Sequence, residues 1–98
     1  MIDHAKAKSN RELLEAATSF KFPGYKYFEE ATGKERHVTL YISEMSIYGR
    51  TFWRINCSLG TYDKTEKRFM YYAAFDFQES TRFYDIYEAL ETVRGLIK

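Results

Sequence analysis

The sequence predicts an α+β domain in which a four-stranded antiparallel β-meander is flanked by an N-terminal and a C-terminal helix, in the order α-β-β-β-β-α. Residues 36–77 contain three runs in which apolar and polar side chains alternate, a pattern typical of strands with one buried face. Short turns separate these runs, and segments with helical features precede and follow them. All the proposed hairpins bury the same set of side chains, and this agreement favours the fold.

The chain before the sheet is expected to form a flexible lead-in over residues 1–8, followed by a single α+β domain over residues 9–98. Ser9 and Glu12 form a capping-box pattern just before two leucines, which indicates the start of a helix. This helix is expected to end near Pro23, because proline cannot continue a helix and disfavours helical geometry in the residue before it.

The first strand is expected over residues 25–31. A two-residue turn at Gly33 and Lys34 would place Tyr27 beside Leu40 in the next strand. Glycine is the natural first residue of a type II′ turn, so the turn and the alternation of side chains agree here.

The other three strands are expected over residues 37–48, 52–59 and 68–78, joined by a two-residue turn at 49–50 and a three-residue loop at 63–65. Each register is fixed by the apolar pattern, because a slip of one residue would turn every inward side chain to solvent. The expected apolar pairs are Ile42 with Cys57, Leu40 with Leu59, Leu59 with Phe69, and Trp53 with Phe75.

The last helix is expected to be capped by Ser80 or Thr81. Apolar side chains follow at spacings of three and four residues, which places them on one face of a helix. The residues predicted on this face are Phe83, Ile86, Tyr87, Leu90, Val93 and Ile97.

Composition narrows the class of protein. A chain of 98 residues that is 45% hydrophobic and 18% aromatic is expected to form one domain with a real core. A net charge of +1 argues against a strongly basic nucleic-acid binder. Cys57 cannot form an internal disulfide, and neither a membrane-spanning run nor a signal peptide is recognised. A cytoplasmic protein without a membrane partner is therefore expected.

No constellation for catalysis is expected. The predicted register turns Cys57 inward and His37 to the opposite face, so the two cannot form a nucleophilic pair. The two histidines lie far apart without ligand spacing, which argues against a metal site. The glycines occur singly, so no phosphate-binding loop is present. The sequence therefore predicts a protein that is not an enzyme, with no catalytic residue, metal or cofactor.

The outer face of the sheet, opposite the predicted core, is the candidate binding surface. A solvated face should consist mainly of Thr, Lys, Glu and Ser, whereas about half of this face is apolar or aromatic. Exposed apolar clusters usually have a partner. The candidate partner-binding residues are Tyr41, Met45, Ile47, Phe52, Arg54, Arg68, Met70 and Tyr72.

Three structural explanations compete with a binding site on this face. A bulge near Ser43 and Glu44 would turn Met45 and Ile47 inward. Alternatively, the N-terminal helix would cover the outer face, or two copies of the chain would form a homodimer through the sheet.

The favoured partner is a protein, because Tyr, Phe, Met and Arg are enriched at interface centres. The domain would then act as an inhibitor by steric occlusion or as an adaptor, as small domains of mobile elements do. The alternative is single-stranded nucleic acid. Its bases would stack on Tyr41, Phe52 and Tyr72, and its phosphates would lie beside the basic residues Lys26, Arg54 and Arg68. Four antiparallel strands followed by a helix are similar in topology to Whirly-type single-strand binders.

Overall fold

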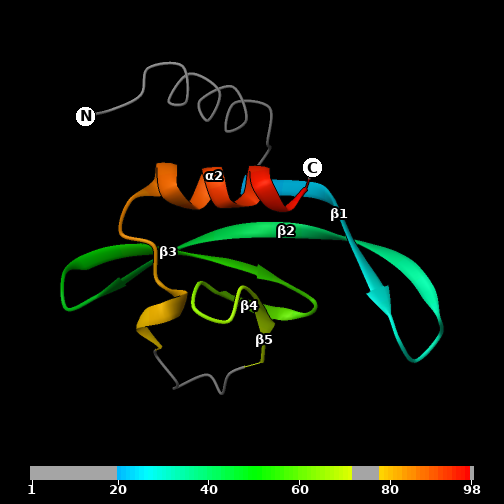
Figure 1. The fold of residues 1–98 in the computed structure, drawn as a ribbon. Helices are drawn as coiled ribbons and strands as arrows, with labels where there is room; N and C mark the ends of the chain where they lie inside the picture. Colours follow the sequence, from blue (N-terminus) through cyan, green and yellow to red (C-terminus); the bar gives the residue numbers. More distant parts are fainter. Residues whose placement is uncertain (1–19, 72–77, 98) are drawn as a thin grey trace.

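The structure is a computed structural model that describes residues 20–71 and 78–97. The predicted lead-in, the helix expected from Ser9 and the candidate residue Tyr72 lie outside these ranges. Figure 1 shows an antiparallel sheet with a helix across one face, which confirms the α+β class. The elements are β1 (Lys21–Glu29), β2 (Lys34–Ile47), β3 (Arg50–Cys57), β4 (Gly60–Asp63), β5 (Arg68–Met70), the 3-10 helix η2 (Glu79–Thr81) and α2 (Ile86–Leu96).

The described sheet has five strands in the order β1-β2-β3-β4-β5, so the predicted count of four is wrong. The run expected to end at Leu59 already ends at Cys57, where a tight turn begins a separate strand, β4. Gly60 makes this possible because its φ of 114° is open to glycine alone. A Cβ atom at this position would lie 2.3 Å from the carbonyl oxygen of Met70, so β4 and β5 approach too closely there for a side chain.

The β2–β3 hairpin turns at Tyr48 and Gly49, one residue earlier than predicted. Both residues have positive φ, 51° and 77°, which marks a type I′ turn and matches the right-handed twist of the strands. Ile42 therefore pairs with Ile55 instead of Cys57, a shift of two residues that leaves every side chain on its predicted face. The register is unbroken from Tyr41 to Ile47, which removes the alternative of a bulge near Ser43.

β1 begins at Lys21, within the segment predicted to end the first helix, and not at Tyr25. A bulge lies between Phe22 and Tyr25, where Gly24 has a φ of 99°. Because the bulge adds a residue, Phe22 and Tyr25 both contribute to the core cluster. The β1–β2 loop is also longer than predicted, so Tyr27 pairs with Arg36 and not with Leu40.

α2 starts at Ile86, later than the predicted cap at Ser80 or Thr81, which instead belong to η2. Asp85 is the N-cap, and its side chain accepts a hydrogen bond from the Tyr87 amide at 2.9 Å. The helix packs on one face of the sheet, which we call the inner face (Figure 1). The buried core there consists of Phe22, Leu40, Ile42, Ile55, Tyr62, Phe83, Ala89, Leu90 and Val93.

A buried carboxylate, Asp63, connects the end of β4 to η2. Its side chain is 3% exposed, and its Oδ1 accepts hydrogen bonds from the amides of Thr65 and Glu66 at 2.8 and 3.0 Å. Its Oδ2 accepts a hydrogen bond from Ser80 Oγ at 2.8 Å, and the Lys64 amide donates to the Ser80 carbonyl at 2.9 Å. The carboxylate therefore fixes both the β4–β5 turn and the position of η2.

After η2 the chain runs back beside the first half of β3. Trp53 and Phe83 exchange amide–carbonyl hydrogen bonds of 2.7 and 2.9 Å, so residues 82–84 continue the sheet for a short distance. Phe83 enters the inner core. Because side chains alternate along an extended chain, Arg82 and Tyr84 lie on the outer face.

Replacement of Asp63 by Ala should lower the free energy of unfolding by about 3 kcal/mol, because several charge-assisted hydrogen bonds to buried groups are lost. The variant Asp63→Asn keeps an acceptor for the turn amides and should show a smaller loss. Asp85→Ala, at an exposed cap, is the control and should lose about 1 kcal/mol. Urea denaturation measures all three; equal losses for Asp63→Ala and Asp85→Ala would show that the buried link is not important.

In the part of the chain that the structure describes, no helix combines the length and apolar character needed to cross a membrane.

Candidate functional site

The outer face is organised in rows of side chains across β2, β3 and the segment after η2. Met45 pairs with Phe52. Since Trp53 pairs with Phe83, Phe52 lies beside Tyr84 and Arg54 lies beside Arg82 on the same face. The face therefore continues beyond β3 onto a segment that the sequence predicts as helix.

Three arginines and two aromatic rings form an arginine–aromatic cluster here: Arg50, Phe52, Arg54, Arg82 and Tyr84. The two rings meet edge to face with their centroids 6.1 Å apart. The guanidinium carbons of Arg82 and Arg54 lie 4.7 and 5.6 Å from the centre of the Phe52 ring, and that of Arg50 lies 3.9 Å from the Tyr84 ring. These are cation–π distances, so each guanidinium lies over a ring of the cluster, two on Phe52 and one on Tyr84.

Phe52 is only 1% exposed, although the sequence predicts it as a surface contact. It lies outside the inner core cluster and is covered on the outer face by Arg82 and Tyr84. The prediction of an accessible Phe52 is wrong because residues 82–84 run as extended chain beside β3 and not as helix. The Phe52 ring packs beneath the guanidinium groups of Arg54 and Arg82, so a binding partner cannot contact it directly.

The charges of the cluster influence each other. Burial, and then the positive charge of Arg82, lower the pKa of Arg54. Arg82 Nη1 donates to Glu79 Oε1 at 3.3 Å, and the Tyr84 hydroxyl donates to the two carboxylate oxygens of Glu79 at 3.0 and 3.1 Å. A carboxylate therefore already sits against the cluster.

A hollow of about 290 Å³, the hairpin-tip groove, opens between the β2–β3 hairpin and η2. Of its residues, the sequence predicts only Ile47 and Phe52 as candidates. The alternation of Arg82, Phe83 and Tyr84 is compatible with a strand, and this signal could have placed Arg82 and Tyr84 on the outer face. The groove is lined by Ile47, Tyr48, Arg50, Phe52, Glu79, Arg82 and Tyr84.

The other predicted site residues are spread over the face. Met45 and Ile47 are half-buried near the tip, and Arg54 is half-buried within the cluster. Tyr41 is exposed and lies beside an uncharged chain in which Thr61 Oγ1 donates to Asn56 Oδ1 at 3.0 Å and Asn56 Nδ2 donates to Ser43 Oγ at 2.8 Å. Arg68 and Met70 lie farther away, on β5. The structure thus does not unite the predicted set in one site.

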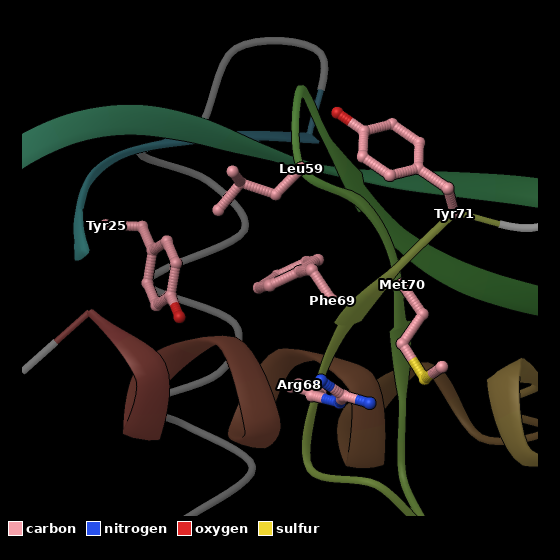
Figure 2. Close-up of a pocket in the computed structure, with 6 residues that line it drawn as sticks. All are labelled: Tyr25, Leu59, Arg68, Phe69, Met70 and Tyr71. Atoms are coloured by element: carbon pink, nitrogen blue, oxygen red, sulfur yellow. The ribbon is translucent and has the colours of Figure 1, made fainter. Parts of the chain in front are cut away.

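A second hollow, of about 460 Å³, lies at β5 (Figure 2). Tyr25 and Phe69 pack there with ring centroids 5.3 Å apart, and Tyr71 donates its hydroxyl proton to the Ser58 carbonyl. Phe69 and Met70 are adjacent in a strand and point to opposite faces, so the hollow wraps around the strand. Its lining includes exposed side chains, Arg68 and Tyr71, which leaves it open to solvent. This is unlike the enclosed, polar-tipped cavities that hold small molecules.

Metal-ligating side chains and the single cysteine are the other groups of chemical interest among the described residues. Within residues 20–71 and 78–97, no three His, Cys, Asp or Glu side chains converge as metal ligands would. Burial raises the pKa of the Cys57 thiol, and hydrogen bonds from the amides of Leu59 and Gly60 oppose this only in part. A raised pKa keeps the thiol protonated and poorly nucleophilic.

Comparison with models of protein families, with curated proteins and with solved structures finds no match to this chain. The geometry of the outer face is therefore the basis for assigning a function.

Tyr48 is held with a φ of 51°, a region that costs a residue other than Gly, Asn or Asp roughly 1 kcal/mol or more. Its side chain is fully exposed, so its replacement removes no packing. Tyr48→Asn creates the favoured Asn-Gly pair of a type I′ turn and should raise the free energy of unfolding by about 1 kcal/mol. Thermal and urea denaturation measure this, with Tyr41→Asn in mid-strand as the control; a destabilised Tyr48→Asn would contradict the interpretation.

Phe52→Ala should lower the free energy of unfolding by about 3 kcal/mol, because it removes a ring buried beneath two side chains. Phe28 is an exposed phenylalanine on β1, and Phe28→Ala should change the free energy of unfolding by less than about 0.5 kcal/mol. Comparable, small effects in both variants would mean that Phe52 is accessible in solution.

Proposed function

We propose that the chain is a non-enzymatic interaction domain that binds a protein partner through the outer face of its sheet, acting as an inhibitor by steric occlusion or as an adaptor. The arginine–aromatic cluster beside the exposed Tyr48 is the observation that carries this proposal. Arg and Tyr are the residue types that dominate binding energy at protein interfaces. Phe52 and Tyr84 hold the guanidinium groups in place, which reduces the entropy that binding would cost.

The strained conformation of Tyr48 supports the same conclusion. A tyrosine with positive φ is unfavourable, and Tyr48 projects from the hairpin tip without packing to offset the strain. Such strain often accompanies functional positions. At this tip it presents a large amphipathic ring at the rim of the groove, where a partner would meet it.

The distribution of charge favours a protein over a nucleic acid. Arg50, Arg54 and Arg82 gather at one end of the face, whereas the neighbouring row of Tyr41, Asn56 and Thr61 is uncharged. A single strand of nucleic acid usually follows a continuous basic groove. Single-stranded nucleic acid is the second candidate because Arg50 stacked on Tyr84, and the exposed Tyr41 farther along the same face, offer surfaces on which bases stack.

The cytoplasm is the proposed compartment. The single cysteine, Cys57, has no cysteine partner within the chain, and a reducing environment suits a free thiol.

The proposal is tested with the full chain immobilised and exposed to a nuclease-treated extract of the cells that produce it. A protein should be retained by the wild type and lost from the double variant Tyr41→Ala/Tyr48→Ala. Tyr87→Ala is the matched control, since Tyr87 lies on α2 with 38% of its surface exposed against 42% for Tyr41. It should retain the protein.

Equal retention of a protein by the wild type, by Tyr41→Ala/Tyr48→Ala and by Tyr87→Ala would contradict binding through the outer face. Retention that requires undigested nucleic acid would favour the second candidate. Light scattering of the pure chain tests the remaining possibility: a stable dimer that Tyr41→Ala/Tyr48→Ala converts to a monomer would assign the face to a homodimer.

A further inference from the structure

The carboxylate of Glu79 is loosely placed in the hairpin-tip groove. Its side chain is 74% exposed, while that of Arg82, to which it pairs, is 17% exposed. The Nη1–Oε1 distance is 3.3 Å, longer than the roughly 2.8 Å of a strong charge-assisted hydrogen bond. Exposed ion pairs of this kind contribute little to stability. The Tyr84 hydroxyl also donates to Glu79, at 3.0 and 3.1 Å, and this contact is exposed as well. Water can replace both contacts, so Glu79 can leave Arg82 and Tyr84 at modest cost in free energy.

Arg82 is incompletely satisfied by this arrangement. Its Nη1 is shared between Glu79 and the hydroxyl oxygen of Tyr84, both at 3.3 Å. Its Nε is buried and has no hydrogen-bond acceptor among the residues that the structure describes. A planar guanidinium can donate two parallel hydrogen bonds to one carboxylate, but Glu79 accepts only one hydrogen bond from Arg82.

Arg50 adds a second guanidinium to the same groove. It is exposed and rests on the face of the Tyr84 ring, at 3.9 Å from the guanidinium carbon to the ring centre. The described residues supply an ion pair to Arg82 but none to Arg50. Of the charged residues lining the groove, two are basic and one is acidic, so the groove keeps a net positive charge.

We infer that the hairpin-tip groove recognises a carboxylate side chain within an acidic segment of a partner protein, and that Glu79 occupies this position until the partner's carboxylate displaces it. This inference rests on the proposed function and names the chemistry of the partner. The incoming carboxylate binds between Arg50 and Arg82, while Tyr48 and Ile47 contact an apolar residue next to it. Glu79 acts as an internal competitor that weakens binding to segments without a well-placed carboxylate.

The size of the groove favours an acidic peptide over a nucleic acid. A volume of about 290 Å³ lies at the lower limit of ligand pockets, so the groove admits one or two side chains. A nucleic acid would bring successive phosphates past the Glu79 carboxylate, whose like charge repels them. A peptide can instead place one carboxylate in the groove and set an uncharged residue beside Glu79.

The test uses the isotopically labelled full chain and nuclear magnetic resonance at low salt. The probe is an acetylated, amidated peptide of glycine and glutamate with one central phenylalanine; the comparison peptide has glutamine in place of glutamate. The acidic peptide should shift the amide signals of Tyr48, Arg50 and Arg82. The glutamine peptide should bind about tenfold more weakly, since the charge-assisted hydrogen bonds are lost.

Two variants change affinity in opposite directions. Glu79→Gln should tighten binding of the acidic peptide about three- to tenfold, because the internal competitor loses its charge, and Arg50→Gln should weaken it about tenfold. Glu35→Gln and Arg36→Gln are charge-matched controls at the far end of β2, and their affinities should stay within about twofold of the wild type.

The inference is overturned if Glu79→Gln leaves the affinity unchanged, if Glu35→Gln tightens binding equally, or if both peptides bind alike. Oligothymidylate that competes for the same signals with higher affinity than the acidic peptide would also overturn it. The proposed function and the carboxylate site can fail independently. If partner capture depends on Tyr41 and Tyr48 but not on Arg50 or Glu79, only the carboxylate site is rejected. If capture is insensitive to all four residues, both proposals are rejected.

Discussion

The buried carboxylate of Asp63 links the fold to the candidate site. It holds η2 against the β4–β5 turn through Ser80, and this position directs the following residues back along β3. Only with that course can Phe83 pair with Trp53 and enter the core, and only then do its neighbours reach the outer face above Phe52. One buried carboxylate, satisfied by two backbone amides and a hydroxyl, thus decides where Arg82 and Tyr84 lie.

β3 is buried on both faces, although the described helix covers only one. Ile55 contacts the inner core, whereas Phe52 on the other face is buried without a helix above it. Its cover consists of Tyr84 and the stems and guanidinium planes of arginines, which carry charge into a partly dry environment. The lowered pKa of Arg54 reflects this cost. A surface built in this way is at once part of the folded core and chemically suited to bind anions.

Alternation in the sequence was sufficient to predict the inner faces of β2 and β3, because shifts of two or four residues in the hairpins leave the period-two pattern intact. It did not reveal β4, whose Tyr62 enters the core. It also placed Met45 and Ile47 on the outer face. The turns could not be predicted, since Tyr48 is a poor residue for positive φ. The sequence predicts helix from Ser80 to Tyr84 because Phe83 fits helical spacing. The alternation of Arg82, Phe83 and Tyr84 is too short to outweigh that spacing, and it does not report the distant hydrogen bonds to Asp63 and Trp53.

Gly60 has a consequence for how this chain can diverge. Every other amino acid brings a Cβ atom onto the backbone of Met70, whereas a Cβ at Gly33 or Gly49 would meet no neighbouring atom within 4 Å. The positive φ of Gly33 and Gly49 still disfavours other residues, but only Gly60 combines a positive φ with a backbone atom in the place of a Cβ, so substitution should be tolerated least at this position. The chain therefore has two fixed points three positions apart: a glycine that lets β4 approach β5, and the aspartate that holds the turn between them.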